Sequence, residues 1–134
     1  MNKEFNNYIN GQFVAAISGH TFPNINPADK EDLIGDFPRS AEADVLAAVE
    51  AAKNALPVWQ NFTPPKRADI IFKAGQLLLE RKKEISAVIA REMGKTMATC
   101  EGDAQSAADM AFYAAGEGRR LYGQTTPSAL NNRL

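Results

Sequence analysis

Residues 40–59 read Ser-Ala-Glu-Ala-Asp-Val-Leu-Ala-Ala-Val-Glu-Ala-Ala-Lys-Asn-Ala-Leu-Pro-Val-Trp, and this stretch decides the fold class. Ser40 is a good helix N-cap, and Glu42 and Asp44 place acids in the first turn, where the helix dipole favours them. Apolar residues then recur at steps of three and four, which predicts one buried helical stripe. The stripe consists of Val45, Ala48, Val49, Ala52, Leu56 and Trp59. Pro57 is expected to end or kink this helix near its last turn.

A second helix is predicted after Thr63, which caps it. Pro64 occupies its first turn, where a missing backbone donor costs nothing. The apolar stripe of this helix continues past a polar break at Arg81-Lys82-Lys83, and Gly94 is a plausible stop. The stripe consists of Ile71, Ala74, Leu77, Leu78, Ile85, Val88 and Ile89.

The third predicted helix starts between Thr96 and Glu101. Its stripe is built mostly of small residues, which lets a partner element approach closely. These are Ala104, Ala107, Ala108, Ala111 and Ala115, with Phe112 beside them. Arg119 and Arg120 are expected in the last turn, followed by Gly123 as a left-handed cap.

Short strands are predicted ahead of the helices. Asn10-Gly11 lies between the apolar pairs Tyr8-Ile9 and Phe13-Val14, and both turn residues tolerate the positive φ of a tight hairpin. A second turn is expected at Ser18-Gly19-His20. Further extended segments follow at residues 21–26, where Pro23 and Pro27 disfavour helix, and at residues 33–37.

These patterns predict an α+β fold that is mostly helical, with short N-terminal strands followed by three helices. The strand-bearing head covers residues 1–39, the helical body covers 40–123, and 124–134 is a tail or the start of another strand. A chain of 134 residues is long enough for one domain, and its 45% hydrophobic content is ordinary for a globular protein.

Composition excludes several classes of function. Fifteen basic and sixteen acidic residues give a net charge of −1, so we expect neither a nucleic-acid partner nor an anionic membrane surface. No uncharged apolar run approaches the roughly 20 residues that span a bilayer. Cys100 is the single cysteine, which suits a reducing compartment, and the first residues lack the pattern of a secretory signal. We therefore expect a cytoplasmic protein.

Motifs that could carry chemistry are weak when taken from the residues alone. Cys100 would need a nearby base, and His20, the only histidine, lies in a predicted surface turn about eighty positions upstream. Gly94-Lys95-Thr96 resembles the end of a phosphate-binding loop, but Ile89 stands where that motif needs glycine and the lead-in is a helix. No G-x-G-x-x-G dinucleotide fingerprint occurs.

The charged clusters have ordinary structural explanations. Glu101 and Asp103 suit dipole compensation at a helix start. Asp29, Glu31 and Asp32 suit a solvated loop, and the Arg81-Lys82-Lys83 run suits a solvated helix face. On this reasoning the chain carries no active site of its own.

The order of segments nevertheless resembles the aldehyde dehydrogenase family over nearly the whole chain. The resemblance rests on segments similar to Y-I-N-G-x-W/F-V, S-G-x-T-F, I-N-P-A, D-V-x-x-A-V-x-A-A…W, E-x-G-K and Y-A-G-E…G. They lie here at residues 8–14, 18–22, 25–28, 44–59, 92–96 and 113–123, with Arg67, residues 78–81 and Pro127-Ser128 also in register. The E-M-G-K-T and A-G-E-G-R-R runs resemble bacterial α-ketoglutaric and succinic semialdehyde dehydrogenases.

This resemblance implies a parent enzyme of α/β fold with a Rossmann-like coenzyme domain, of which the chain is the N-terminal part. It implies NAD(P)-dependent oxidation of an aldehyde, possibly a semialdehyde, through a cysteine thiohemiacetal. The family's catalytic cysteine, glutamate and asparagine lie downstream of Leu134, and Cys100 does not occupy the nucleophile's place. We therefore expect no catalytic, coenzyme-binding or metal-binding residue in the 134, no bound NAD or NADP, and no activity of the chain alone.

Two further roles follow from the resemblance, each with a structural alternative. Some family members bind a monovalent cation near the positions of Asn24-Ile25 and Glu92, although Glu92 is equally well explained as a solvated helix residue. The helix around Phe112-Tyr113 lines the substrate tunnel of the parent or packs against its other domain. Helix stripes shaped for absent partners also predict a homo-oligomer. The rival interpretation is a stand-alone helical interaction module without catalytic activity.

Overall fold

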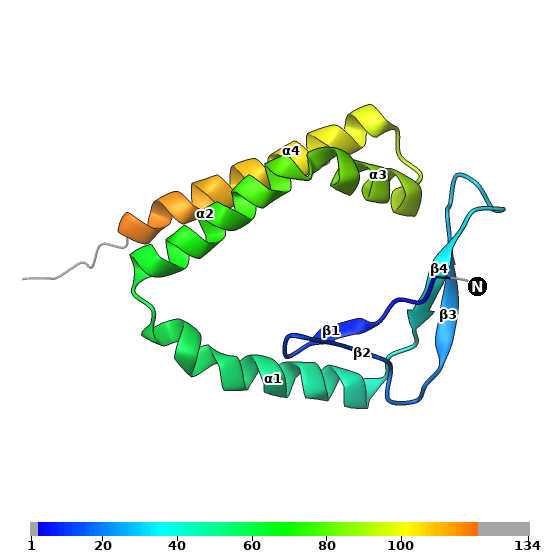
Figure 1. Cartoon of the computed structure of the whole chain (residues 1–134), viewed down its shortest axis with the longest axis horizontal. Coiled ribbons are helices and arrows are strands. Elements are labelled where there is room, and N and C mark those ends of the chain that lie inside the picture. The colour runs from blue at the N-terminus through cyan, green and yellow to red at the C-terminus, as the bar shows by residue number, and fades with distance from the viewer. Residues whose placement is uncertain (1–2, 121–134) are drawn as a thin grey trace, which may run out of the picture.

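The computed structural model describes residues 3–120, and its elements follow an open outline rather than a closed layer (Figure 1). Four short strands come first, and four α-helices and a 3₁₀ turn follow them. The strands are β1 (Asn7–Ile9), β2 (Gln12–Val14), β3 (Thr21–Ile25) and β4 (Leu33–Pro38). The helices are α1 (Glu42–Asn61), α2 (Pro64–Glu80), α3 (Lys82–Met93), α4 (Met97–Gly116) and the 3₁₀ turn η1 (Glu117–Arg119). The predicted class, short strands followed by a mostly helical body, is confirmed.

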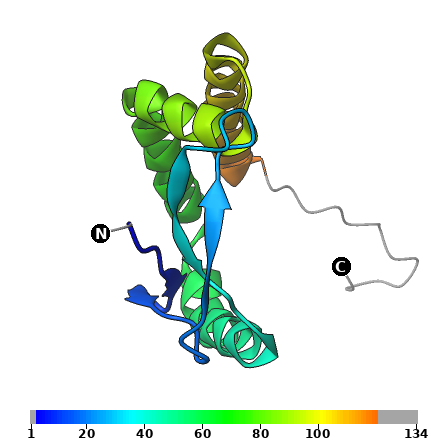
Figure 2. The ribbon, with the colours of Figure 1, turned by 90° about the vertical axis from the view of Figure 1, so that its right-hand side faces the viewer.

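The strands form two separate antiparallel pairs, β1 with β2 and β3 with β4. The Asn10-Gly11 hairpin is confirmed, because both residues adopt positive φ, 52° and 78°. The turn before β3 is confirmed as well, with Gly19 at a φ of 68° and its amide donating to the Ala16 carbonyl. Two views show the β3–β4 pair extending from the start of α1 towards the end of α3 (Figures 1 and 2).

The prediction that Ser40 caps α1 is wrong, because the N-cap is Ala41. The Asp44 carboxylate accepts hydrogen bonds from the amides of Ala41 and Ile17, both at 2.8 Å. The Asp44 carboxylate, in the first turn, therefore fixes the start of α1 in place of the Ser40 hydroxyl. The Ser40 hydroxyl is hydrogen-bonded to the Asn7 side chain instead.

Pro57 does not end α1, which continues to Asn61. Proline removes the hydrogen bond to the carbonyl four residues earlier, that of Lys53. Lys53 lies on a stretch of α1 that is exposed to water, so solvent can hydrate this carbonyl. The helix therefore tolerates a proline in its last turns.

Four α-helices are present in residues 3–120, where the sequence predicted three. The second predicted helix divides at Arg81, whose φ and ψ of −100° and 13° redirect the chain between α2 and α3. The Arg81 guanidinium pairs with Glu84 in the first turn of α3, and this pairing supports the new direction. The polar break in the stripe is thus a helix boundary.

The ends of α3 and α4 test three other predictions. Gly94 stops the helix, as predicted, and does so in the left-handed conformation. Helix α4 starts at Met97, within the predicted range, and Thr96 is its N-cap. Helix α4 ends at Gly116, earlier than predicted, so Arg119 lies in η1 and Arg120 follows it rather than lying in the last α-helical turn. Gly123, Pro127-Ser128 and the predicted tail 124–134 lie outside the described residues.

The helical core is small and lies where α4 packs on α2 and α3. Cys100, Ala104 and Ala108 are buried along one face of α4, which confirms that small residues let the helices approach closely. The Phe112 ring fills the space beside Gly75, where an added Cβ would lie 2.9 Å from the ring. Gly118 contacts α2 so closely that a Cβ there would meet Ala68. The close contacts fix η1 and α2 together.

The strand end of the molecule has a second small cluster. Phe5 stacks on Phe37 of β4 with ring centroids 4.3 Å apart. Ile34, also in β4, is buried. Residues 3–5 run parallel to β4 beside Asp36. The Phe5 amide donates to the Asp36 carbonyl, and the Asp36 amide donates to the Lys3 carbonyl.

Candidate functional surface

Large apolar side chains that the predicted stripes should bury are exposed in this structure. On α1, Val45 is 58% exposed, Val49 44% and Trp59 38%, and the only buried residue of the helix is Asp44. The prediction of a buried stripe on α1 is therefore wrong for this chain. The apolar periodicity is real, but nothing within residues 3–120 covers it.

The solvent-accessible surface area of the chain is also larger than that of a folded monomer of the same mass. The chain exposes 10,586 Å², whereas a folded monomer of this mass exposes about 6,900 Å². Sixteen residues can contribute at most about 2,500 Å² to this total, so residues 3–120 expose at least about 8,000 Å², against about 6,300 Å² expected for their mass. The described residues thus expose some 1,700 Å² beyond what a self-sufficient domain of their size would.

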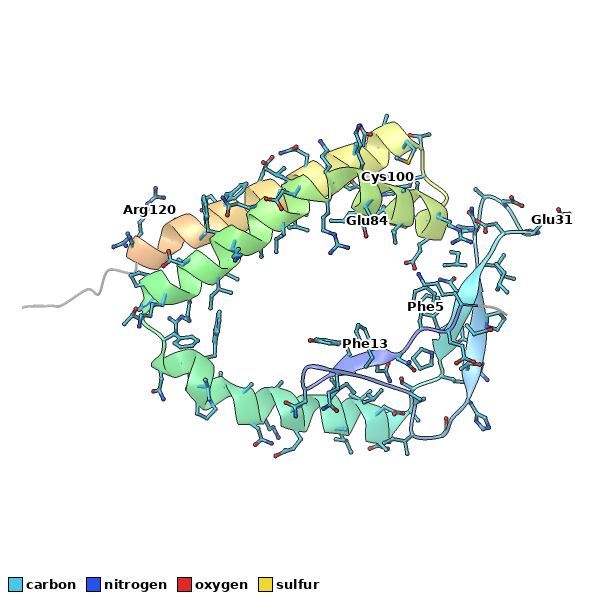
Figure 3. The ribbon with its side chains drawn as sticks, in the orientation of Figure 1. Phe5, Phe13, Glu31, Glu84, Cys100 and Arg120 are labelled. Atoms are coloured by element: carbon cyan, nitrogen blue, oxygen red, sulfur yellow. The ribbon has the colours of Figure 1, made fainter. Side chains whose placement is uncertain are left out.

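A groove lies between the β1–β2 hairpin and α1. Its volume is about 360 Å³. One wall is residues 8–11 of the hairpin, and the other is a row of alanines on α1: Ala48, Ala51, Ala52 and Ala55. Phe13, which is 74% exposed, lies on the side of the hairpin that faces the interior of the outline (Figure 3). We call this groove the hairpin–α1 groove.

The wall of the groove is held in place by hydrogen bonds near the start of α1. Asp44 joins the segment before β3 to the first turn of the helix through Ile17, and Asn7 on β1 bonds with Ser40. The hydrogen bonds that Asp44 accepts from two backbone amides lower its pKa; the bond from Ala41 has the larger effect and the bond from Ile17 the smaller. The carboxylate is consequently committed to the fold and is not available as an acid or base at neutral pH.

A charged pair joins α3 to the loop between β3 and β4. Arg91 donates from Nε to Asp32 at 2.8 Å and from Nη2 to the Leu33 carbonyl at 3.0 Å. The Arg91 guanidinium, with help from Asn26, lowers the pKa of Asp32 to about 2. The solvated-loop interpretation is therefore wrong for Asp32, whereas Asp29 serves the loop itself by accepting from the Glu31 amide.

The sequence-predicted chemical candidates lie in separate places. Cys100 is completely buried in the α4 core, with the Ser86 hydroxyl 3.4 Å from its carbonyl. His20 is exposed in the turn before β3, as predicted. Lys95 pairs with Asp103 at 2.9 Å, and a helix precedes Gly94, so the Gly94-Lys95-Thr96 run is not arranged as a phosphate-binding loop. Cys100 thus has no arrangement here for nucleophilic chemistry.

The remaining candidates fit structural roles in residues 3–120. Glu101 is exposed on the first turns of α4, and Glu92 is exposed near the end of α3. Phe112 packs within the chain, 5.1 Å from the ring of Phe72, whereas Tyr113 beside it is 65% exposed. Within this part of the chain, no group of three or more His, Cys, Asp or Glu side chains is placed to hold a metal ion.

A model of the aldehyde dehydrogenase family matches residues 13–134. The chain belongs to the aldehyde dehydrogenase family. It is 37% identical over 128 residues to alpha-ketoglutaric semialdehyde dehydrogenase of Bacillus subtilis, covering 96% of this chain and 26% of that protein. It is 34% identical to the NADP-dependent succinate-semialdehyde dehydrogenase of Escherichia coli, covering 89% of this chain and 24% of the relative. The chain spans about a quarter of the length of these relatives.

Solved structures support the fold of this aldehyde dehydrogenase segment. An NAD-dependent aldehyde dehydrogenase of Sinorhizobium meliloti superposes with a TM-score of 0.91 and 30% identity, over 99% of this chain and 27% of that one. The open outline is thus the fold that this segment has inside a complete family member. The predicted parent, an α/β aldehyde dehydrogenase with a Rossmann-like fold, is confirmed.

The starts of α1, α2 and α4 in this aldehyde dehydrogenase segment are not arranged to hold the phosphates of a dinucleotide. A helix N-terminus binds phosphate through free amides and positive dipole. Glu42 and Asp44 make the start of α1 acidic, and α2 begins with Pro64-Pro65, which have no amide hydrogen. At the start of α4 the Thr96 side chain accepts from the Thr99 amide. We therefore derive no chemical step of a coenzyme from residues 3–120.

None of the helices described here combines the length and the apolar character needed to cross a bilayer. The contacts that sequence reasoning missed are Asp44 with Ile17 and Arg91 with Asp32. An acidic residue three places after the N-cap was a usable signal for the first. The Arg91–Asp32 contact joins residues 59 positions apart, and no local sequence pattern indicates it.

Proposed function

We propose that the chain is the N-terminal part of the coenzyme-binding domain of an NAD(P)-dependent aldehyde dehydrogenase. The observation that carries the proposal is the match of 96% of the chain to 26% of a curated semialdehyde dehydrogenase. The exposed stripe of α1 supports it, because this face has the character of an interior surface. The same exposure weighs against a stand-alone interaction module, which would bury its own stripes.

For the substrate we propose a semialdehyde that carries a carboxylate. The similar curated proteins are named for alpha-ketoglutaric, glutarate, succinate and malonate semialdehydes. Each of these molecules has an aldehyde at one end and a carboxylate at the other. NAD or NADP would accept the hydride when the aldehyde is oxidised to the acid, as the names of the similar structures support.

In this proposal, residues 3–120 position other parts of the enzyme and do not take part in the chemistry. The nucleophile, the base and the coenzyme contacts belong to the complete enzyme, and none is assigned to this chain. Glu92 with Asn24-Ile25 stays a prediction for a monovalent cation site. We also propose that the chain by itself forms a homo-oligomer, because exposed apolar surface favours association, and that the enzyme is cytoplasmic.

A chimera tests this function. The chain would replace the matched N-terminal quarter of the Bacillus subtilis relative, and NADH or NADPH formation would be measured with alpha-ketoglutaric semialdehyde. We expect turnover by the chimera and none above background by the 134-residue chain. Butanal, a neutral aldehyde, serves as the matched control substrate and should be oxidised more slowly.

Two results would contradict the proposal. Turnover by the chain alone would show that it holds catalytic residues. A chimera that is soluble, has the circular dichroism of the relative and binds NAD, yet oxidises no aldehyde, would show that the chain does not perform the part assigned to it.

A further inference from the structure

We propose that this chain can bind, as a separate polypeptide, to the other three-quarters of an aldehyde dehydrogenase, with the hairpin–α1 groove at the centre of the interface. The inference rests on the proposed function, but it adds that no covalent connection is needed. The partner is defined by its chemistry: a folded body that presents an apolar ridge to the groove.

The exposed area of the chain matches a large interface. The described residues expose about 1,700 Å² more than a self-sufficient domain of their size, and a partner that covers this surplus buries a similar area of its own. The total of about 3,400 Å² lies in the range of 2,000–5,000 Å² that obligate interfaces bury. An interface of this size holds two polypeptides together without a peptide bond between them.

The shape of the groove suits a protruding element of a partner. Ala48, Ala51, Ala52 and Ala55 are spaced by three and four residues, so they form one face of α1. Side chains this small let another element approach to the short end of the 8–10 Å range for packed helices. Tyr8 and Ile9 of the hairpin close the other side. The groove therefore accepts a ridge from a partner.

Preorganisation of the groove also favours binding. The groove is already formed in the chain, because Asp44 and the Asn7–Ser40 pair fix its walls. A surface that does not have to order itself on binding loses less affinity. The lining of the groove contains no charged side chain. Helical spacing places Glu50 and Lys53 on the opposite side of α1.

A second copy of the chain is a poorer occupant of the same groove. Two identical molecules that meet through this face bring one hollow against another, and each hollow needs a ridge to fill it. Self-association can shelter the exposed side chains, but it leaves the groove unfilled. The complementary body should therefore displace a second copy.

The experiment uses the chimera with a protease site inserted between the chain and the rest of the relative. The protein is folded, cut, and passed over a size-exclusion column with light scattering and aldehyde oxidation recorded. We expect the two pieces to elute together as one complex that keeps most of its activity. A chimera that is active before cutting but separates after it would overturn the inference and leave the proposed function intact.

Paired variants test the groove itself. Ala52→Glu places a charge in the groove, whereas Lys53→Glu, its neighbour, places the same group on the opposite face. We expect dissociation of the cut complex to accelerate at least ten-fold in the first and to stay unchanged in the second. Equal effects of the two variants, or recovery of the chain only as a homo-oligomer, would show that the groove is not the interface.

Discussion

Arg91 on α3 and Asp32 in the β3–β4 loop form a charged pair across 59 positions of sequence. The guanidinium also donates to the Leu33 carbonyl, so one side chain holds both the loop and the start of β4. Close beside it, a Cβ on Gly94 would lie 3.1 Å from Pro27. This pair is the main charged connection between the strand end and the helical end in residues 3–120.

Asp32→Asn should make the free energy of unfolding less dependent on pH in the acid range. The pKa of Asp32 falls from 3.8 to about 2 in the folded chain, so the unfolded chain binds the proton more readily. The pair stabilises the fold fully above about pH 4, and this contribution is lost as the pH falls towards 2. Urea unfolding at several pH values should show that the variant has a lower free energy of unfolding near neutral pH. That free energy should also fall less than in wild type as the pH is lowered. Glu31→Gln, in the same loop, is the control, and an unchanged pH dependence in Asp32→Asn would contradict the expectation.

Local signals predicted the parts of the fold that local chemistry decides. Asn10-Gly11 and Gly94 act within one turn of the chain, and each was placed correctly. The division at Arg81 was seen only as a polar break, because a change of helix direction depends on how α3 packs on α4.

Long-range features of the surface could not be predicted in the same way. Asp44 was expected to favour the dipole of its own helix, and its bond with Ile17 depends on a chain reversal 27 residues earlier. The stripe containing Val45, Val49 and Trp59 was identified correctly as apolar. Periodicity specifies which face is apolar but does not specify whether the partner that covers it belongs to the same polypeptide.

Asp44→Ala should loosen the start of α1 and the segment before β3 together. The carboxylate is the acceptor for the amides of Ile17 and Ala41, and removing it leaves both without this partner. Hydrogen exchange of these two amides should accelerate roughly ten-fold while α4 stays protected. Glu42→Gln, in the same turn, should leave both amides protected. Equal exchange in wild type and Asp44→Ala would show that the carboxylate does not hold this junction.

Gly118→Ala and Gly102→Ala should have opposite effects on stability. A Cβ at Gly118 would lie 2.3 Å from that of Ala68 and 2.9 Å from the Pro64 carbonyl oxygen, so η1 must move away from α2. We expect a loss of about 1–3 kcal/mol in the free energy of unfolding. Gly102 on α4 has open space at the same point, and alanine there should gain up to about 1 kcal/mol from helix propensity. Urea unfolding curves measure both, and a neutral Gly118→Ala would show that the two elements are not packed this closely.

Trp59 should report on whether the α1 face is covered. It is the only tryptophan of the chain, it is 38% exposed, and helical spacing places it in line with Ala52 and Ala55. In dilute chain its fluorescence should be quenched readily by acrylamide. Joining the chain to the rest of an aldehyde dehydrogenase, intact or cut, should shift the emission to the blue and reduce quenching, because the indole loses contact with water. The reporter Lys53→Trp in a Trp59→Phe background lies on the opposite face and should stay quenchable throughout. Blue, protected emission from Trp59 in dilute monomeric chain would mean that the chain covers this face by itself, and the argument for an external partner would fail.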